Sequence, residues 1–183
     1  TVGADNSSTT FASSITEGGG AALLALVKAG TGTLTLTGSN NYTGGTTINA
    51  GGALQIGNNG TSGGIAGSVT DNGTLAFART DAVTFNGVIS GTGTVTKSGS
   101  ATLRLSGANT FTGDTTVTAG KLQLFGSGRL ADTTDVIVSD GATFELNGVS
   151  DTVATIASSG TGALALTGGS LTSGDSTSTT FAG

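Results

Sequence analysis

The chain has 183 residues and a net charge of −5, and its six lysines and arginines stand apart from one another among eleven aspartates and glutamates. Such scattered cations argue against a nucleic-acid-binding protein, because phosphate contacts need clustered lysine and arginine. The 34 glycines without one proline do not fit collagen or a disordered linker, and the absence of cysteine excludes disulfide bonds and thiolate zinc sites.

Along the chain, short runs of alternating apolar and polar residues are separated by glycine-rich turns. A first run ends at Lys28, and in the next, at 33–37, two leucines alternate with threonines, so that both leucines face one side of a strand. Similar runs follow at 46–48, 53–56, 74–77, 83–85 and 94–96. Isolated hairpins of strands this short are unstable in water. We therefore expect each turn of the chain to pair in parallel with the next turn.

Two segments, about 28–57 and 97–126, are copies of one pattern spaced 69 residues apart, or 68 at the last matched position. We predict structural roles for the matched residues: apolar side chains in the core, asparagines in left-handed or side-chain-bonded turns, and aromatic rings over the corners of the coil. A sugar- or receptor-binding role for the aromatic rings is the alternative. The matched positions are Leu34 and Leu103, Leu36 and Leu105, Asn40 and Asn109, Tyr42 and Phe111, Gly44 and Gly113, Ile48 and Val117, and Leu54 and Leu122.

The repeat predicts an all-β fold, a three-sided parallel β-solenoid of roughly eight coils, with three coils of about 23 residues in each 69-residue unit. An antiparallel sandwich, the competing fold, does not require a fixed spacing over two long copies. Residues 9–12 resemble residues 179–182, so we interpret 1–183 as one segment of a longer array. Five glycines are expected to supply positive φ at the corners: Gly32, Gly38, Gly44, Gly45 and Gly51.

Residues 30–51, GTGTLTLTGSNNYTGGTTINAG, resemble the autotransporter-associated β-strand repeat of type V secretion passenger domains, and 97–126 resemble it equally well. The resemblance implies a right-handed parallel β-helix at the surface of a bacterium with a Gram-negative type of envelope, or secreted from it. It also implies export through a C-terminal outer-membrane barrel, which we do not expect within this chain.

The function that this resemblance implies is that of a structural and adhesive stalk segment that aids passenger export and folding. We expect no enzymatic activity, cofactor, metal or nucleic-acid partner. The expected partners are the neighbouring coils of the same array, together with ligands on host cells, matrix or neighbouring cells. Contact with a membrane is expected only through the absent barrel.

The alternative function is that of a β-helix polysaccharide-processing or glycan-binding domain, which needs converging carboxylates. The one acidic cluster in the sequence comprises Asp132, Asp135, Asp140 and Glu145. We interpret Asp132 and Asp135 as part of a solvated polar loop and Asp140, which precedes Gly141, as a turn residue. Specific calcium binding is disfavoured because a calcium ion takes six to eight oxygen ligands. Threonine ladders at 31–37 and 92–96 raise the possibility of ice binding, although outward threonine is common on strands.

Overall fold

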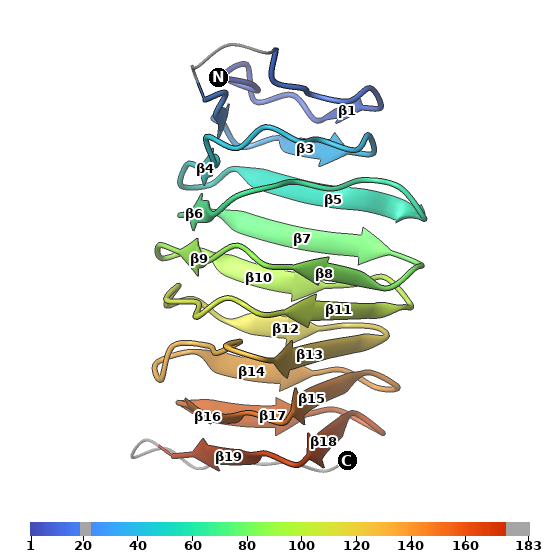
Figure 1. Ribbon diagram of the computed structural model, residues 1–183, viewed down its shortest axis with the longest axis vertical. Helices are drawn as coiled ribbons and strands as arrows, with labels where there is room; N and C mark the ends of the chain where they lie inside the picture. The colour runs from blue at the N-terminus through green and yellow to red at the C-terminus, as the bar shows by residue number, and fades with distance from the viewer. Residues whose placement is uncertain (19–22, 175–183) are drawn as a thin grey trace.

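The computed structural model describes residues 1–18 and 23–174, which contain nineteen strands and no helix. Successive turns of the chain lie one upon the next from the N-terminal to the C-terminal end (Figure 1). Neighbouring strands pair in parallel throughout the described residues, as between β3 and β5 or β11 and β13. The predicted parallel β-solenoid is confirmed, with about seven turns, and the antiparallel sandwich is wrong.

The strands lie on three sides of the coil, which we call the first, second and third faces. The first face is a sheet of eight strands: β1 (Thr9–Phe11), β3 (Thr33–Leu36), β5 (Ala53–Gly60), β7 (Thr74–Arg79), β10 (Thr94–Lys97), β12 (Thr115–Val117), β14 (Asp135–Val138) and β17 (Thr155–Ser158). The second face has five: β8 (Val83–Phe85), β11 (Thr102–Leu105), β13 (Lys121–Phe125), β15 (Thr143–Asn147) and β18 (Ala163–Thr167).

The third face is divided into two separate sheets. Its first sheet comprises β2 (Leu26–Lys28), β4 (Thr46–Ile48), β6 (Val69–Asp71) and β9 (Ile89–Ser90). Its second sheet comprises β16 (Ser150–Val153) and β19 (Ser170–Ser173). The chain passes the third face between these sheets without a regular strand, and the turns there are joined by isolated backbone hydrogen bonds. None of the described residues forms a helix long and apolar enough to cross a membrane.

The interior consists of apolar columns that run along the solenoid axis. On the first face, Leu34 pairs with Leu54, Leu54 with Leu75 and Leu75 with Val95, and all four side chains are buried. Each turn therefore covers the apolar residues of the turn before it, and this burial supplies the main favourable free energy of folding. A strand of three or four residues is stable here because its neighbours lie on both sides of it.

The predicted coil length of about 23 residues is wrong. On the first face Thr33 pairs with Ala53 and Ala53 with Thr74, so a turn takes 20 or 21 residues there, although the first turn is longer. On the other two faces the paired positions lie 19 to 23 residues apart. Three turns from Leu34 end at Val95, whereas Leu103 lies beyond it on the second face. The 69-residue spacing thus corresponds to three turns plus one side. An alternating leucine run suits either face, so sequence periodicity alone could not reveal this rotation.

Only two of the five predicted corner glycines have a positive φ: Gly45, at 84°, and Gly51, at 77°. The other three, Gly32, Gly38 and Gly44, are required for a different reason, namely close approach of consecutive turns. A Cβ atom on Gly38 would lie 2.2 Å from the carbonyl oxygen of Ser13 in the preceding turn. The residues 179–182, which the sequence pattern relates to 9–12, lie outside the described residues.

One corner contains a ladder of stacked glycines. A Cβ on Gly87 would lie 2.1 Å from the oxygen of Gly67, and one on Gly107 would lie 2.3 Å from the oxygen of Gly87. We expect Gly107→Ala to destabilise the chain by about 1–3 kcal/mol, because the turns must move apart to admit the methyl group. Urea denaturation followed by circular dichroism measures this effect. Gly64→Ala is the control, since its Cβ would meet nothing within 4 Å, and an equal loss of stability in both variants would contradict the prediction.

Candidate functional site

The four acidic residues singled out in the sequence do not converge on one site. The carboxylate of Asp135 accepts a hydrogen bond from Thr155 Oγ1 at 2.7 Å, and that of Asp140 accepts bonds from Thr161. Glu145 is paired with Lys121, whereas Asp132 is exposed. Asp135 is the first residue of β14, so of the two predicted loop residues only Asp132 lies outside a strand, and Glu145 lies in β15. Within residues 1–18 and 23–174, no three carboxylates are gathered where they could hold a metal ion.

The repeat asparagines form the most specific polar arrangement in the fold. Asn109 is buried, and its Oδ1 accepts a bond from the amide of Ile89, in the preceding turn, at 2.9 Å. Its Nδ2 donates to the carbonyl of Gly107 in its own turn at 2.9 Å and to that of Arg129 in the following turn at 2.8 Å. One side chain therefore joins three consecutive turns at a corner where the sheets are interrupted.

Asn40 makes the same contacts in the first copy. Its Oδ1 accepts from the amide of Ile15 at 2.7 Å, and its Nδ2 donates to the carbonyls of Gly38 and Gly64. Neither asparagine has a positive φ, so neither adopts the left-handed conformation that was one of the two predicted possibilities. Each side chain does bond a carbonyl two residues away in its own turn, and it also bonds the turns on either side. Sequence reasoning missed the bridging role because the amide's partners lie 20 to 25 residues away.

The two repeat aromatic residues are fully buried rather than packed over the outside of a corner. The hydroxyl of Tyr42 is hydrogen-bonded to Thr46 Oγ1 at 2.8 Å, which satisfies the one polar group that Phe111 lacks. Buried rings cannot serve as exposed contacts for a sugar or a receptor. The apolar repeat positions Leu34, Leu36, Ile48, Leu54, Leu103, Leu105, Val117 and Leu122 are also buried, whereas Gly44 is exposed and Gly113 half-buried.

Two lysines at equivalent repeat positions lie inside the solenoid. Lys28 is 0% exposed and Lys97 is 2% exposed. The ammonium group of Lys28 donates to the carbonyls of Ala29 and Gly30, and that of Lys97 donates to the carbonyls of Gly99 and Ala119. Burial lowers the pKa of Lys97 to about 8. In the sequence these lysines are only isolated cations. Nothing in a lysine at the end of an apolar run shows that its ammonium group turns back onto backbone carbonyls.

Asp71 is a buried acid without a cationic partner in the described residues. It follows Lys28 and Ile48 along one interior column, so the isoleucine separates the two charged groups. Oδ1 accepts from the amide of Gly73 at 2.9 Å, but the buried Oδ2 has no hydrogen-bond partner. Desolvation raises the pKa of Asp71 to about 6. A Cβ on Gly93 would lie 2.5 Å from this carboxylate, so glycine is needed there.

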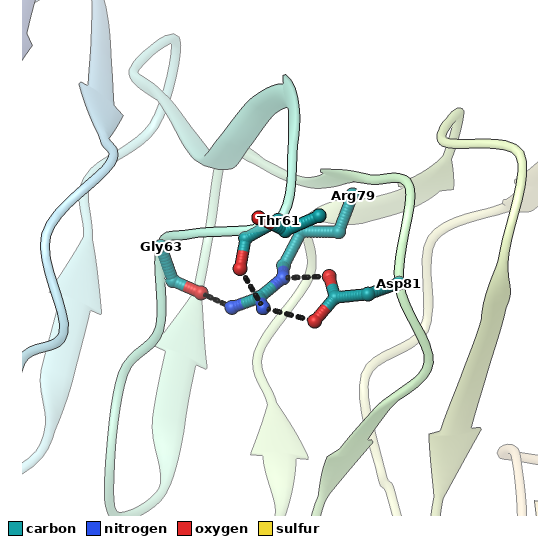
Figure 2. Close-up of polar contacts among 4 residues, drawn as sticks. All are labelled: Thr61, Gly63, Arg79 and Asp81. Carbon is teal, nitrogen blue, oxygen red and sulfur yellow. Dashed lines mark hydrogen bonds and ion pairs between the residues drawn. The ribbon is translucent and has the colours of Figure 1, made fainter.

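An arginine clamp fixes the loop that follows β5. The guanidinium of Arg79 donates to the carbonyls of Thr61 and Gly63 and forms a two-point contact with the carboxylate of Asp81, at 2.8 Å from Nε and 2.6 Å from Nη2 (Figure 2). The arginine holds the pKa of Asp81 below its ordinary value. Arg79 looks isolated in the sequence, yet it joins segments 16 to 18 residues apart.

A chain of polar side chains crosses four turns on the outer side of the second face. Arg104 Nε donates to Gln123 at 2.8 Å, and Gln123 Nε2 donates to Glu145 at 2.8 Å. Glu145 is also paired with Lys121 at 2.8 Å and accepts from Thr167 Oγ1 at 3.0 Å. Gln123 and Glu145 are buried by their neighbours, so these groups bind one another and leave little free for a ligand.

The threonine ladders do not form a continuous array. Along the outer column of the first face, Thr35 pairs with Gln55 and Gln55 pairs with Ala76 before threonine returns at Thr96. An ordered water lattice would require threonine in every turn, so nothing in this face favours ice binding.

We expect Asn109→Ala to lower the free energy of unfolding by about 2 kcal/mol, because the variant leaves the buried amide of Ile89 without its acceptor. Chemical denaturation measures the difference. Asn86→Ala is the control: Asn86 is exposed and accepts only from Ser106 Oγ, so its loss should be within about 0.5 kcal/mol. Equal effects of the two substitutions would show that the bridge does not stabilise the fold.

Asp71 gives a prediction about pH. Its pKa in the folded chain, about 6, lies above the ordinary value of 3.8, so the folded state binds the proton more tightly than the unfolded state. Its contribution to stability is therefore complete below about pH 4 and is lost as the pH rises through about 6. We expect Asp71→Asn to raise the free energy of unfolding at pH 7 by about 2 kcal/mol and to have a smaller effect at pH 4.

Denaturation at several pH values measures this difference. Asp140→Asn is the control, because hydrogen bonds from Thr161 lower the pKa of that exposed carboxyl and its contribution to stability has the opposite dependence on pH. A gain from Asp71→Asn that is the same at pH 4 and pH 7 would contradict the assignment of the effect to a buried charge.

Comparison with known proteins relates this architecture to a secretion system. Residues 26–56 and 95–124 match the passenger-associated-transport-repeat. The chain is 44% identical over 114 residues to the adhesin BmaC autotransporter of Brucella suis biovar 1 (strain 1330). That alignment covers 62% of this chain but 3% of the Brucella protein, and no solved structure matches the chain. The resemblance seen in the sequence is confirmed: the chain carries two passenger-associated-transport repeats.

Proposed function

We propose that this chain is a stalk segment in the passenger of an autotransporter adhesin, displayed on or secreted from a Gram-negative bacterium, with a structural rather than catalytic role. The adhesin relative and the two matched repeats support this proposal. The chain spans 3% of that relative, so its ligands on host cells, matrix or neighbouring cells belong to the proposal as well.

The observation that carries the proposal is how each repeat closes a turn. The second and fourth strands of a copy are neighbours in one sheet: Leu34 in β3 pairs with Leu54 in β5 in the first copy, and Leu103 in β11 with Leu122 in β13 in the second. Between these strands, Asn40 or Asn109 bonds to the turns before and after. A newly added turn can therefore fold against the preceding turn, because a solenoid turn contacts only its neighbours.

This local closure suits export in an extended form followed by folding outside the cell. A segment of about thirty residues contains all the strands needed to form one turn and to start the next. The stacked product is a rod, which sets a distance between whatever lies at its two ends. At about 4.8 Å per strand layer, seven turns extend the passenger by roughly 35 Å.

Surface display of the 183-residue chain tests the proposal. The chain, with an epitope tag, is placed between a signal peptide and the translocation barrel of an autotransporter and expressed in a Gram-negative host. We expect the tag to be labelled on intact cells and the segment to resist added protease. Adherence of these cells to epithelial monolayers or to one another, compared with cells that display the barrel alone, tests the adhesive part of the proposal.

The double variant Asn40→Ala/Asn109→Ala should give several-fold less protease-resistant segment on the surface, because two turn-bridging side chains are removed. Asn86→Ala should behave as the unmodified chain. A segment that reaches the surface but is degraded as readily as an unfolded chain, or a double variant that is displayed and protected normally, would contradict a role of the repeat in folding at the surface.

A further inference from the structure

The third face changes character where its second sheet begins. The segment after β13 carries Arg129 and Asp132, and together with β16 and β19 it surrounds a concavity of about 370 Å³. This volume lies at the small end of the range of about 300–1,000 Å³ for ligand pockets. The concavity lies where regular strand pairing begins again on the third face, at β16, after the interrupted part. It therefore accompanies the break between the two sheets of that face.

The floor of the concavity is an array of hydroxyl groups on two paired strands. Ser150 pairs with Ser170 and Thr152 with Thr172, and all four residues line the concavity. The hydroxyl groups of Ser150 and Ser170 are hydrogen-bonded at 2.8 Å. The strand register therefore holds a two-by-two arrangement in which each hydroxyl group can donate or accept a hydrogen bond.

One arginine and two aspartates complete the lining. Arg129 Nη1 donates to the carbonyl of Ser150 at 2.9 Å, which orients the guanidinium group and leaves its other N–H groups without a protein acceptor in the described residues. Asp132 is exposed and has no hydrogen-bond partner for its carboxylate within the same residues. Asp151 is buried and accepts from the amide of Leu130 at 2.9 Å, so it serves the fold rather than the opening.

This lining selects against several ligand classes. It contains no large apolar or aromatic side chain, so it offers no anchor for an apolar molecule. No three potential metal ligands are grouped in the described residues. A lining with one guanidinium and the carboxyl groups of Asp132 and Asp151 also gives no preference for an anion. The ligand class that remains is a neutral molecule with many hydroxyl groups. Its adjacent hydroxyl groups can accept hydrogen bonds from Arg129, donate to Asp132, and do either with the hydroxyl groups of the floor.

We propose that this concavity binds a neutral saccharide, whose neighbouring hydroxyl groups bond to Arg129, Asp132 and the threonines of β16 and β19. The site goes beyond the stalk role and does not depend on it. An open site without an aromatic platform gives weak binding, on the order of millimolar, and useful adhesion would come from many copies presented together.

The test uses the purified 183-residue chain, attached in many copies to beads and applied to immobilised oligosaccharides of three kinds. Neutral animal-type glycans and neutral fragments of bacterial polysaccharide distinguish the two sources of such a ligand, and sialylated and uronic-acid glycans test for an anionic preference. We expect binding to at least one neutral class. Saturation-transfer NMR with the soluble chain and the bound oligosaccharide then confirms direct contact.

Three variants of the lining and one control connect binding to the concavity. Arg129→Gln, Asp132→Asn and the double variant Thr152→Val/Thr172→Val should each weaken binding by about tenfold, since each removes hydrogen bonds to the ligand. Thr74→Val/Thr94→Val is the matched control, because these threonines are also paired on neighbouring strands but lie on the first face. Circular dichroism checks that every variant remains folded.

Asp132→Asn keeps the proposal testable if the other substitutions disturb folding, because Asp132 is exposed and makes no hydrogen bond with its carboxylate in the described residues. Absence of binding to every neutral class, stronger binding to the acidic glycans, or equal binding by the chain and a folded Asp132→Asn variant would overturn the proposal. None of these results would affect surface display, so failure of this site is distinguishable from failure of the stalk role.

Discussion

Hydrogen bonding between consecutive turns is the constraint on which the rest of this structure depends. A strand of three or four residues has no stability of its own, and its N–H and C=O groups must find partners in the turns before and after it. Along the three faces, strand pairing satisfies this need. At the interrupted corners, Asn40 and Asn109 supplement the isolated backbone bonds, because a primary amide can accept from one turn and donate to the next. An aspartate in the same setting can only accept, as Asp151 does from Leu130.

The same constraint explains the rotation of the two repeats relative to each other. What a repeat must preserve is contact between its own second and fourth strands, and both copies preserve it: β3 with β5 on the first face, and β11 with β13 on the second. Nothing in that contact specifies which face is used. Close stacking does restrict the corners, however. At glycines such as Gly107, the carbonyl of the preceding turn leaves no room for a side chain. The high glycine content therefore reflects the spacing between turns as well as the positive φ that many other glycines adopt.

Sequence reasoning recovered the class of fold because burial of alternating leucines is a local pattern. Leu34 and Leu36 are buried as their alternation with threonine predicts. The length of a turn and the bridging asparagines could not be predicted, because both depend on which residues 20 or more positions away become neighbours. The buried ammonium group of Lys97 was missed for a related reason: its partners are backbone carbonyls, which leave no mark in the sequence. The hydroxyl floor on β16 and β19 likewise arises from strand register, in which Thr152 pairs with Thr172, and no sequence motif predicts that pairing.

A stack of this kind tolerates imperfect turns, and that tolerance connects its stability with its surface chemistry. Because each turn contacts only its neighbours, the cost of burying Asp71 without a full set of partners falls mainly on the turns around it. A globular core shared by all elements would transmit such a defect more widely. The gap in pairing between β9 and β16 is accommodated in the same way: the first and second faces stay continuous beside it while the third face opens. Regular repeats thus maintain the rod, and departures from the repeat provide the positions at which a concavity with its own chemistry can form.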